Sequence, residues 1–220
     1  MKQIIKNALI LFAITAVAGV LLAVVNEMTK GPIAERQQQQ KTEAYQSVFA
    51  DAQFIPATLP DMASPEYASF AEAHPKSTID EINIATDASG ATQGYVLTVT
   101  NKEGYGGEIR FVMGIRMDGT LNGISILSTN ETVGLGREAQ NVLAPQFAGK
   151  NVTAFTYTKT GSVADSEVDA ISSATITTNA VVNGVNAGLD YFHQYLTEGG
   201  AGNEEGEGTD RRKSIFQRSD

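Results

Sequence analysis

The chain of 220 residues has no cysteine, no tryptophan and only two histidines. Without cysteine it cannot form disulfides, thiolate metal sites or iron–sulfur clusters held by its own side chains. His74 and His193 are far apart in sequence and fall short of the three or four ligands that a histidine-based metal site needs. Basic residues are also scarce: 16 Lys and Arg against 25 Asp and Glu give a net charge of −9, which argues against nucleic-acid binding. Any redox chemistry must therefore come from an organic cofactor or a partner.

Charged residues are absent from Ala8 to Val25, an almost unbroken apolar run. At about 1.5 Å per residue, this run and the preceding turn span a hydrocarbon core of about 30 Å. Because Lys2 and Lys6 precede the run, the positive-inside rule predicts a short cytoplasmic N-terminus, with the rest of the chain across the membrane. A cleaved signal peptide is the alternative, but no Ala-x-Ala cleavage site follows the run. We expect residues 1–28 to be a retained, single-pass transmembrane anchor.

Two segments outside the expected globular domain have distinctive compositions. Residues 29–76 should form a stalk helix and then a proline-rich connector with turns and one short helix. Residues 198–220 are rich in glycine and glutamate and predict a disordered tail, because they contain too few apolar residues to offset ordering. A partner-docking role for the basic cluster at residues 211–213 is a secondary interpretation.

Residues 77–197 have the pattern of an α+β domain. Short β-branched or apolar runs, separated by turn pairs such as Ser89-Gly90 and Asp118-Gly119, predict antiparallel hairpins with no room for helical crossovers. The predicted strands are 82–84, 94–100, 109–116, 123–127 and 152–157, and the predicted helices are 138–147 and 179–196. The last helix has an apolar stripe at spacings of three and four, formed by Val182, Val185, Leu189, Phe192 and Leu196. The fold class is therefore α+β: a single N-terminal transmembrane helix, then a twisted, largely antiparallel sheet packed with helices.

The most informative stretch is residues 169–178, Asp-Ala-Ile-Ser-Ser-Ala-Thr-Ile-Thr-Thr, directly before the last predicted helix. Free backbone N–H groups and the helix dipole make such a helix start a ready anion site. A phosphate at Thr175 could accept hydrogen bonds from these N–H groups and from Ser172, Ser173 and Thr177. From the residues alone, a strand end followed by ordinary Ser/Thr capping of the helix is the simpler interpretation.

Two glycine-rich segments precede this stretch. They are residues 103–108, Glu-Gly-Tyr-Gly-Gly-Glu, and residues 131–136, Glu-Thr-Val-Gly-Leu-Gly. Glycine permits tight turns and close approach of the backbone to a flat ligand. A glycine-rich hairpin and an ordinary strand-to-helix loop are equally open interpretations of the two segments.

In this order, the segments resemble the FMN-binding domain shared by the G subunit of the Rnf complex and the C subunit of the sodium-pumping NADH:quinone reductase. The resemblance depends on an N-terminal anchor, a Gly-Tyr-x-Gly loop, Glu-Thr-x-Gly-Leu-Gly and Asp-x-x-Ser-x-Ala-Thr-x-Thr. It covers residues 94–196 well and residues 1–50 loosely. The length of the chain is more similar to the Rnf subunit.

The resemblance implies a set of site residues. It implies that a flavin transferase attaches FMN to Thr175 through a phosphoester, within a sequence that includes Asp169, Ser172, Ser173, Ala174 and Thr177. It also implies that the isoalloxazine ring is surrounded by Tyr105, Gly106, Glu131, Thr132, Gly134 and Leu135. Lys159 would be a nearby basic residue. The chain departs from the family at Ser173, where Gly is most common, and at Val133, where Pro is usual. If Ser173 needs a positive φ, serine is strained there.

By resemblance, the chain is a single-cofactor electron carrier of a bacterial inner membrane, with its FMN domain on the periplasmic side. The complex would exchange electrons between ferredoxin and NAD, coupled to Na⁺ or H⁺ transport. Since the chain lacks a Gly-x-Gly-x-x-Gly nicotinamide fingerprint, its reductant is another subunit, and it is not catalytic alone. Its other expected partners are a flavin transferase and membrane lipid. The alternatives are the quinone-reductase C subunit and a membrane-tethered structural or ligand-binding module without redox function.

Overall fold

The computed structural model describes residues 2–59, 64–132 and 136–197. The chain divides into two compact units, residues 1–42 and 43–220. The described residues of the first unit all lie in helix α1 (Lys2–Val48), whose last turns belong to the second unit. Within the described residues, α1 is the one helix long and apolar enough to cross a membrane. The expected anchor and the expected stalk helix are continuous in α1, which contains Pro32.

The second unit is built on a five-stranded antiparallel sheet with strand order β1-β2-β3-β4-β5. The strands are β1 (Gln53–Ala57), β2 (Ser77–Thr86), β3 (Thr92–Gly104), β4 (Gly107–Arg116) and β5 (Leu121–Thr129). The predicted turn pairs are confirmed, because Gly90 (φ 84°) and Gly119 (φ 86°) have the positive φ that such turns need. The predicted α+β class with a largely antiparallel sheet is confirmed.

Strand β1 was not predicted, because its proline suggested a connector. Pro56 pairs with Asn83 at the edge of the sheet, where the missing N–H of proline is tolerated. The expected short helix of the connector is present as α2 (Pro65–Ala73), which begins after the N-cap Ser64.

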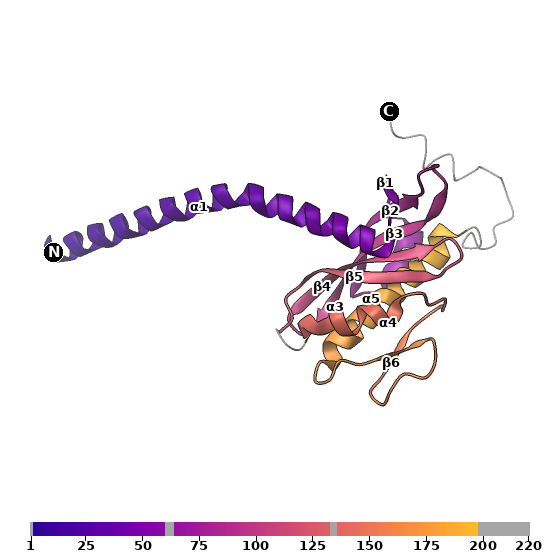
Figure 1. Cartoon of the computed structure of the whole chain (residues 1–220). Coiled ribbons are helices and arrows are strands. Elements are labelled where there is room, and N and C mark those ends of the chain that lie inside the picture. Colours follow the sequence, from indigo (N-terminus) through magenta and orange to yellow (C-terminus); the bar gives the residue numbers. More distant parts are fainter. Residues whose placement is uncertain (1, 60–63, 133–135, 198–220) are drawn as a thin grey trace. The chain divides into compact units, whose positions relative to one another are not determined.

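The other helices lie against one face of the sheet (Figure 1). They are η1 (Gly136–Glu138), α3 (Ala139–Val142), α4 (Ala144–Phe147) and α5 (Thr175–Tyr191), which continues as η2 (Phe192–Leu196). The helix predicted over 138–147 is divided in two, with Pro145 in the first turn of α4. The last helix begins at Thr175 rather than at Asn179, so Thr175 is a helical residue instead of preceding the helix.

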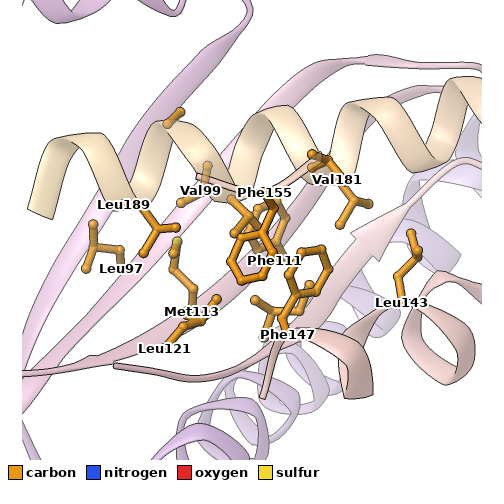
Figure 2. Close-up of a cluster of buried hydrophobic side chains, with 14 of the residues drawn as sticks. Leu97, Val99, Phe111, Met113, Leu121, Leu143, Phe147, Phe155, Val181 and Leu189 are labelled. Carbon is orange, nitrogen blue, oxygen red and sulfur yellow. The ribbon is translucent and has the colours of Figure 1, made fainter. Parts of the chain in front are cut away.

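The main core lies between α5 and the sheet, where Leu189 and Val181 of α5 face strand residues such as Phe111 (Figure 2). The predicted apolar stripe of α5 packs into this core. Two glycines let the helix approach the strands closely. A Cβ at Gly184 would lie 2.9 Å from the Phe111 ring, and a Cβ at Gly188 would collide with the Met113 sulfur. A side chain at either position would push α5 away from the sheet.

The opposite face of the sheet holds a second, smaller core. Tyr45 and Val48, in the last turns of α1, pack with Val96 and Val112. These valines alternate with residues of the main core, as expected for the two faces of a strand. The Val48 carbonyl also accepts a 2.8 Å hydrogen bond from Asn122 Nδ2. The end of α1 is therefore part of the folded second unit.

A separate pair of short parallel strands, β6 (Thr156–Thr158) and β7 (Glu167–Asp169), completes the fold. The strand predicted over 152–157 is wrong except at its end. Phe155 precedes β6 and is buried against Phe147, with ring centroids 4.9 Å apart. Its backbone N–H and C=O bond the side chain of Asn186, at 2.7 and 2.9 Å. An α5 side chain therefore takes the place of a neighbouring strand there.

Candidate functional site

A tight turn leads into helix α5. The Ala174 N–H donates to the Ile171 carbonyl at 3.1 Å, and Ser173 has a φ of 64°. A positive φ at the third residue is what a type II turn requires, and glycine usually supplies it. The conditional prediction for this position is confirmed: Ser173 occupies a conformation that favours glycine.

The hydroxyl groups of residues 172–178 divide into two sets. Thr177 and Thr178 are buried, and their side chains already have partners within the domain. The Thr178 hydroxyl accepts from the Ile171 N–H (3.1 Å) and donates to the Ala174 carbonyl (3.0 Å), which locks the turn onto the helix. Ser172 and Ser173 are exposed, and Thr175 is half-buried. Only this second set faces solvent.

Within the part of the chain that the structure describes, no side chain caps the start of α5. The N-cap residue is Ala174, which has no polar side chain, and no side-chain cap hydrogen bond is present. The interpretation of residues 172–178 as an ordinary Ser/Thr cap is therefore wrong. The first N–H groups of the helix remain as donors for an anion.

A buried carboxylate lies behind this helix start. Glu131 is 5% exposed. Its Oε2 accepts a 2.9 Å hydrogen bond from the Thr177 hydroxyl, and its Oε1 accepts a 3.3 Å bond from the Gly106 N–H. The carboxylate thus connects the β3–β4 loop, the end of β5 and the first turn of α5. Thr177 was expected to bond a phosphate, but its hydroxyl proton is directed at Glu131 instead.

Two glycines provide the space for this carboxylate, and a third lets the backbone of Asn130 approach closely. A Cβ at Gly104 would lie 2.6 Å from Glu131 Oε1, and a Cβ at Gly136 would lie 2.6 Å from Glu131 Oε2. A Cβ at Gly106 would collide with the Asn130 carbonyl. The glycines were expected to admit a flat ligand. In the described residues, they admit the backbone and the Glu131 side chain.

Helix α5 has a second polar connection, to strand β3, which the sequence did not predict. Asn183 Nδ2 of α5 donates to Glu103 Oε2 at 2.6 Å, and Asn101 Oδ1 accepts from the Glu103 N–H at 2.8 Å. Glu103 lies in the glycine-rich segment but was not singled out, because no local pattern shows that an asparagine 80 positions later faces it.

Asp169 organises the loop between β6 and β7. Its Oδ1 accepts a 2.6 Å hydrogen bond from the Ser162 N–H, and its backbone N–H donates to Gln146 Oε1 at 2.6 Å. Asp169 is paired with Thr158 in the strand register, so Lys159 follows directly beside the turn that precedes α5. The Lys159 side chain is exposed. The structure therefore brings Asp169 and Lys159 to the same corner as the turn.

The remaining predicted residues surround Glu131 in sequence or space. Tyr105 is 73% exposed at the tip of the β3–β4 loop, and Thr132 is exposed directly after Glu131. Gly134 and Leu135 lie outside the described residues, as does Val133. A hollow lined by residues such as Phe49, Gln93 and Arg116 lies at the opposite ends of β3 and β4, so it belongs to a different part of the domain.

Comparisons with known proteins show to which family this chain belongs. Residues 104–190 match the FMN-binding domain family, and residues 1–48 match the RnfG N-terminal region. The chain is 36% identical over 199 residues to the G subunit of the Na(+)-translocating ferredoxin:NAD(+) oxidoreductase complex of Acetobacterium woodii, covering 87% of this chain and 92% of that protein. The chain belongs to the RnfG family. It is the G-type component of an ion-translocating oxidoreductase complex, with an FMN-binding domain.

A second relative agrees with this assignment. The G subunit of the ion-translocating oxidoreductase complex of Cereibacter sphaeroides is 31% identical over 204 residues, covering 87% of this chain and 85% of that protein. Among solved structures, the crystal structure of Shewanella oneidensis NqrC overlays on 51% of this chain and 57% of that chain, with 21% identity and a TM-score of 0.44. Membership in the RnfG family decides against the quinone-reductase C subunit as the identity of this chain.

Proposed function

We propose that this RnfG subunit carries FMN covalently, as a phosphoester on Thr175. The observation that carries the proposal is the uncapped start of α5, where Thr175 is the first helical residue and Ala174 occupies the N-cap. An ester there places a phosphate at the positive end of the helix dipole. The match of residues 104–190 to the FMN-binding domain family supports the identity of the ligand.

The residues of this corner fit such a group. Free N–H groups of the first turn and the exposed Ser172 and Ser173 hydroxyls would hold the phosphate, with Lys159 contributing positive charge. The exposed Tyr105, Gly106 and Thr132 would contact the isoalloxazine ring. Gly134 and Leu135, which lie outside the described residues, are proposed as further contacts from the resemblance alone. Bound FMN supplies the electron-transfer chemistry, while the protein fixes its position.

The attachment needs an activated FMN donor. A flavin transferase would bring FMN as a phosphoanhydride, such as flavin adenine dinucleotide. The Thr175 Oγ1–phosphorus bond forms as the phosphoanhydride bond breaks, and the hydroxyl proton leaves with the departing nucleoside monophosphate. The protein gains the mass of FMN minus one water. Asp169 and Ser172 would form part of the sequence that the transferase recognises.

The place of the subunit in the cell follows from its relatives and from α1. The complex would transfer electrons between ferredoxin and NAD, coupled to Na⁺ or H⁺ movement. The name of the Acetobacterium woodii relative states ferredoxin, NAD(+) and Na(+) translocation for that protein. Lys2 and Lys6 precede the apolar part of α1, so the N-terminus would be cytoplasmic and the FMN domain periplasmic. The membrane helix would contact lipid and other subunits of the complex.

Mass spectrometry of Thr175 variants tests the ester. The full chain, produced together with its flavin transferase, should gain the mass of one FMN minus water and fluoresce in a denaturing gel. Thr175→Val should abolish both signals. Thr153→Val, which changes an exposed threonine elsewhere in the domain, is the matched control and should keep both. A Thr175→Val chain that remains fluorescent would show that the ester lies on another residue.

A further inference from the structure

We propose that Glu131 is a positioning residue for Thr175, because its carboxylate fixes the first turn of α5 through the Thr177 hydroxyl. This inference rests on the proposed ester at Thr175. The acceptor is Oε2, 2.9 Å from Thr177 Oγ1, and Thr177 lies two residues after Thr175 in the same helical turn. Glu131 therefore acts through Thr177 rather than by contact with the cofactor.

The burial of Glu131 argues for a specific role. A carboxylate that is 5% exposed loses most of its hydration, and within the described residues no basic side chain forms a salt bridge with it. Buried charges of this kind are weak devices for general stability, since desolvation offsets much of what their hydrogen bonds contribute. A neutral apolar residue would fill the same space with less desolvation. The retained carboxylate is explained by the two donors that it holds in place.

The fit around the carboxylate makes the connection rigid. Gly104 and Gly136 leave room for the two carboxylate oxygens, because a Cβ at either position would lie 2.6 Å from one of them. Glu131 Oε1 also accepts from the Gly106 N–H, so the β3–β4 loop moves together with the helix start. Helix ends fray unless tertiary contacts hold them. Here the Glu131–Thr177 pair is the contact that joins the first turn to the β3–β4 loop, and the Thr178 hydroxyl bonds the turn that precedes it.

The second connection of α5 provides a matched comparison. Asn183 and Glu103 join the same helix to strand β3 at 2.6 Å, further along α5 than Thr175. Loss of this bond should loosen the middle of the helix and leave the first turn held by Glu131. If Glu131 positions Thr175, the two connections must differ in their effect on attachment.

Charge and geometry can be separated at Glu131. Glu131→Gln removes the negative charge but keeps an amide oxygen for the Gly106 N–H and gains an amide N–H for the Thr177 oxygen. Glu131→Ala removes both connections. A positioning role predicts that glutamine largely restores what alanine loses, whereas a direct electrostatic role predicts that the two variants behave alike.

The experiment measures flavin attachment to the full-length chain, produced without flavin and purified in detergent. The chain is incubated with flavin transferase and flavin adenine dinucleotide, and in-gel fluorescence gives the initial rate at several chain concentrations. Glu131→Ala and Thr177→Val should lower the maximal rate by about tenfold or more, because misplacing a reacting group by about 1 Å has effects of this size. The half-saturating chain concentration should change little. Glu131→Gln, Thr177→Ser and the control Asn183→Ala should stay near wild type.

Amide hydrogen exchange of the flavin-free chains provides a readout independent of attachment. Peptides covering residues 171–178 should exchange faster in Glu131→Ala and Thr177→Val than in wild type, and at the wild-type rate in Asn183→Ala. The inference is overturned if Asn183→Ala slows attachment as much as Glu131→Ala, or if Glu131→Gln is as slow as alanine. Wild-type chain that accepts flavin elsewhere than Thr175 would contradict the proposed function, and the exchange data would still decide whether Glu131 fixes the first turn.

Discussion

The two sides of the α5 start differ in how their polar groups are satisfied. On the inner side, Glu131 is buried, and both its oxygens have donors within the domain. On the outer side, Ser172 and Ser173 are exposed, and Ala174 leaves the helix without a side-chain cap. We call these the closed side and the open side. Polar groups on the closed side are bonded within the domain, whereas those on the open side are the groups that we propose for the ligand.

The comparison explains why residues with similar chemistry have different roles. Thr177 and Thr175 are both threonines of one helical turn, yet one is buried against a carboxylate and the other is half-buried at the open side. The buried Thr177 hydroxyl is out of reach of a flavin donor, whereas Thr175 is partly accessible to solvent. The geometry therefore favours Thr175 over Thr177 for modification.

The largest effect should come from the core beneath both sides. Phe111→Ala removes a fully buried ring that packs against Gly184 of α5, and it should lower the free energy of unfolding by about 3–5 kcal/mol. Amide exchange should rise on the closed and the open side together, since both depend on the same helix. Val163→Ala, at a residue 94% exposed, is the control and should leave stability unchanged. If amide exchange rose on one side alone, the two sides would not depend on the same core.

The next largest loss of stability should come from a larger side chain on the closed side. Gly136→Ala places a Cβ 2.6 Å from both Glu131 Oε2 and Thr177 Oγ1, and it should lower the free energy of unfolding by about 1–3 kcal/mol. Denaturant titration measures this change. The open-side loop at residues 159–166 should keep its exchange rates. Stability equal to wild type would mean that the carboxylate has more room than the structure shows.

A smaller, local effect should follow from changing the open side. Asp169→Ala leaves the Ser162 N–H without its acceptor, and it should lower the free energy of unfolding by about 1 kcal/mol. Limited proteolysis should find the loop at residues 159–166 more susceptible. Asp165→Ala, whose side chain is 86% exposed in its ion pair with Lys150, is the matched control and should change little. If the two variants were equally susceptible to proteolysis, Asp169 would not be the residue that organises the loop.

The smallest effect should be a gain in stability. Ser173→Gly relieves a φ of 64° and should raise the free energy of unfolding by about 0.5 kcal/mol, because relief of the left-handed conformation exceeds the added chain entropy of glycine. Thermal unfolding measures the shift. Ser172, the neighbour in the same turn, has no positive φ, so Ser172→Gly is the control and should be destabilising. A loss of stability in Ser173→Gly would show that serine is not strained.

Much of the fold could be predicted from sequence because its signals are local. The hairpins follow from alternating apolar runs and from glycines such as Gly90 and Gly119 in their turns. Strand β1 could not, because Pro56 is evidence against a strand until the edge position is known. The conformation of the backbone at Phe155 could not be predicted either, because its hydrogen-bond partner is the side chain of Asn186 on α5.

The candidate site divides in the same way. Thr175 and the strained Ser173 could be identified from a contiguous segment and its resemblance to a family. The bond between Glu131 and Thr177 spans 46 positions and depends on the register of β5 and the placement of α5, which no local pattern contains. The attachment of FMN at Thr175 therefore stays a prediction from the sequence, whereas the bond between Glu131 and the helix is seen only in the structure.

The central claim is the ester on Thr175, and the most direct measurement is tandem mass spectrometry of the protein produced in its native cells. Proteolysis should release a fluorescent peptide containing residues 171–178. Fragmentation should assign the mass of FMN minus water to Thr175, with Thr177 and Thr178 unmodified. A native peptide of unmodified mass, or a flavin on any other residue, would contradict the account.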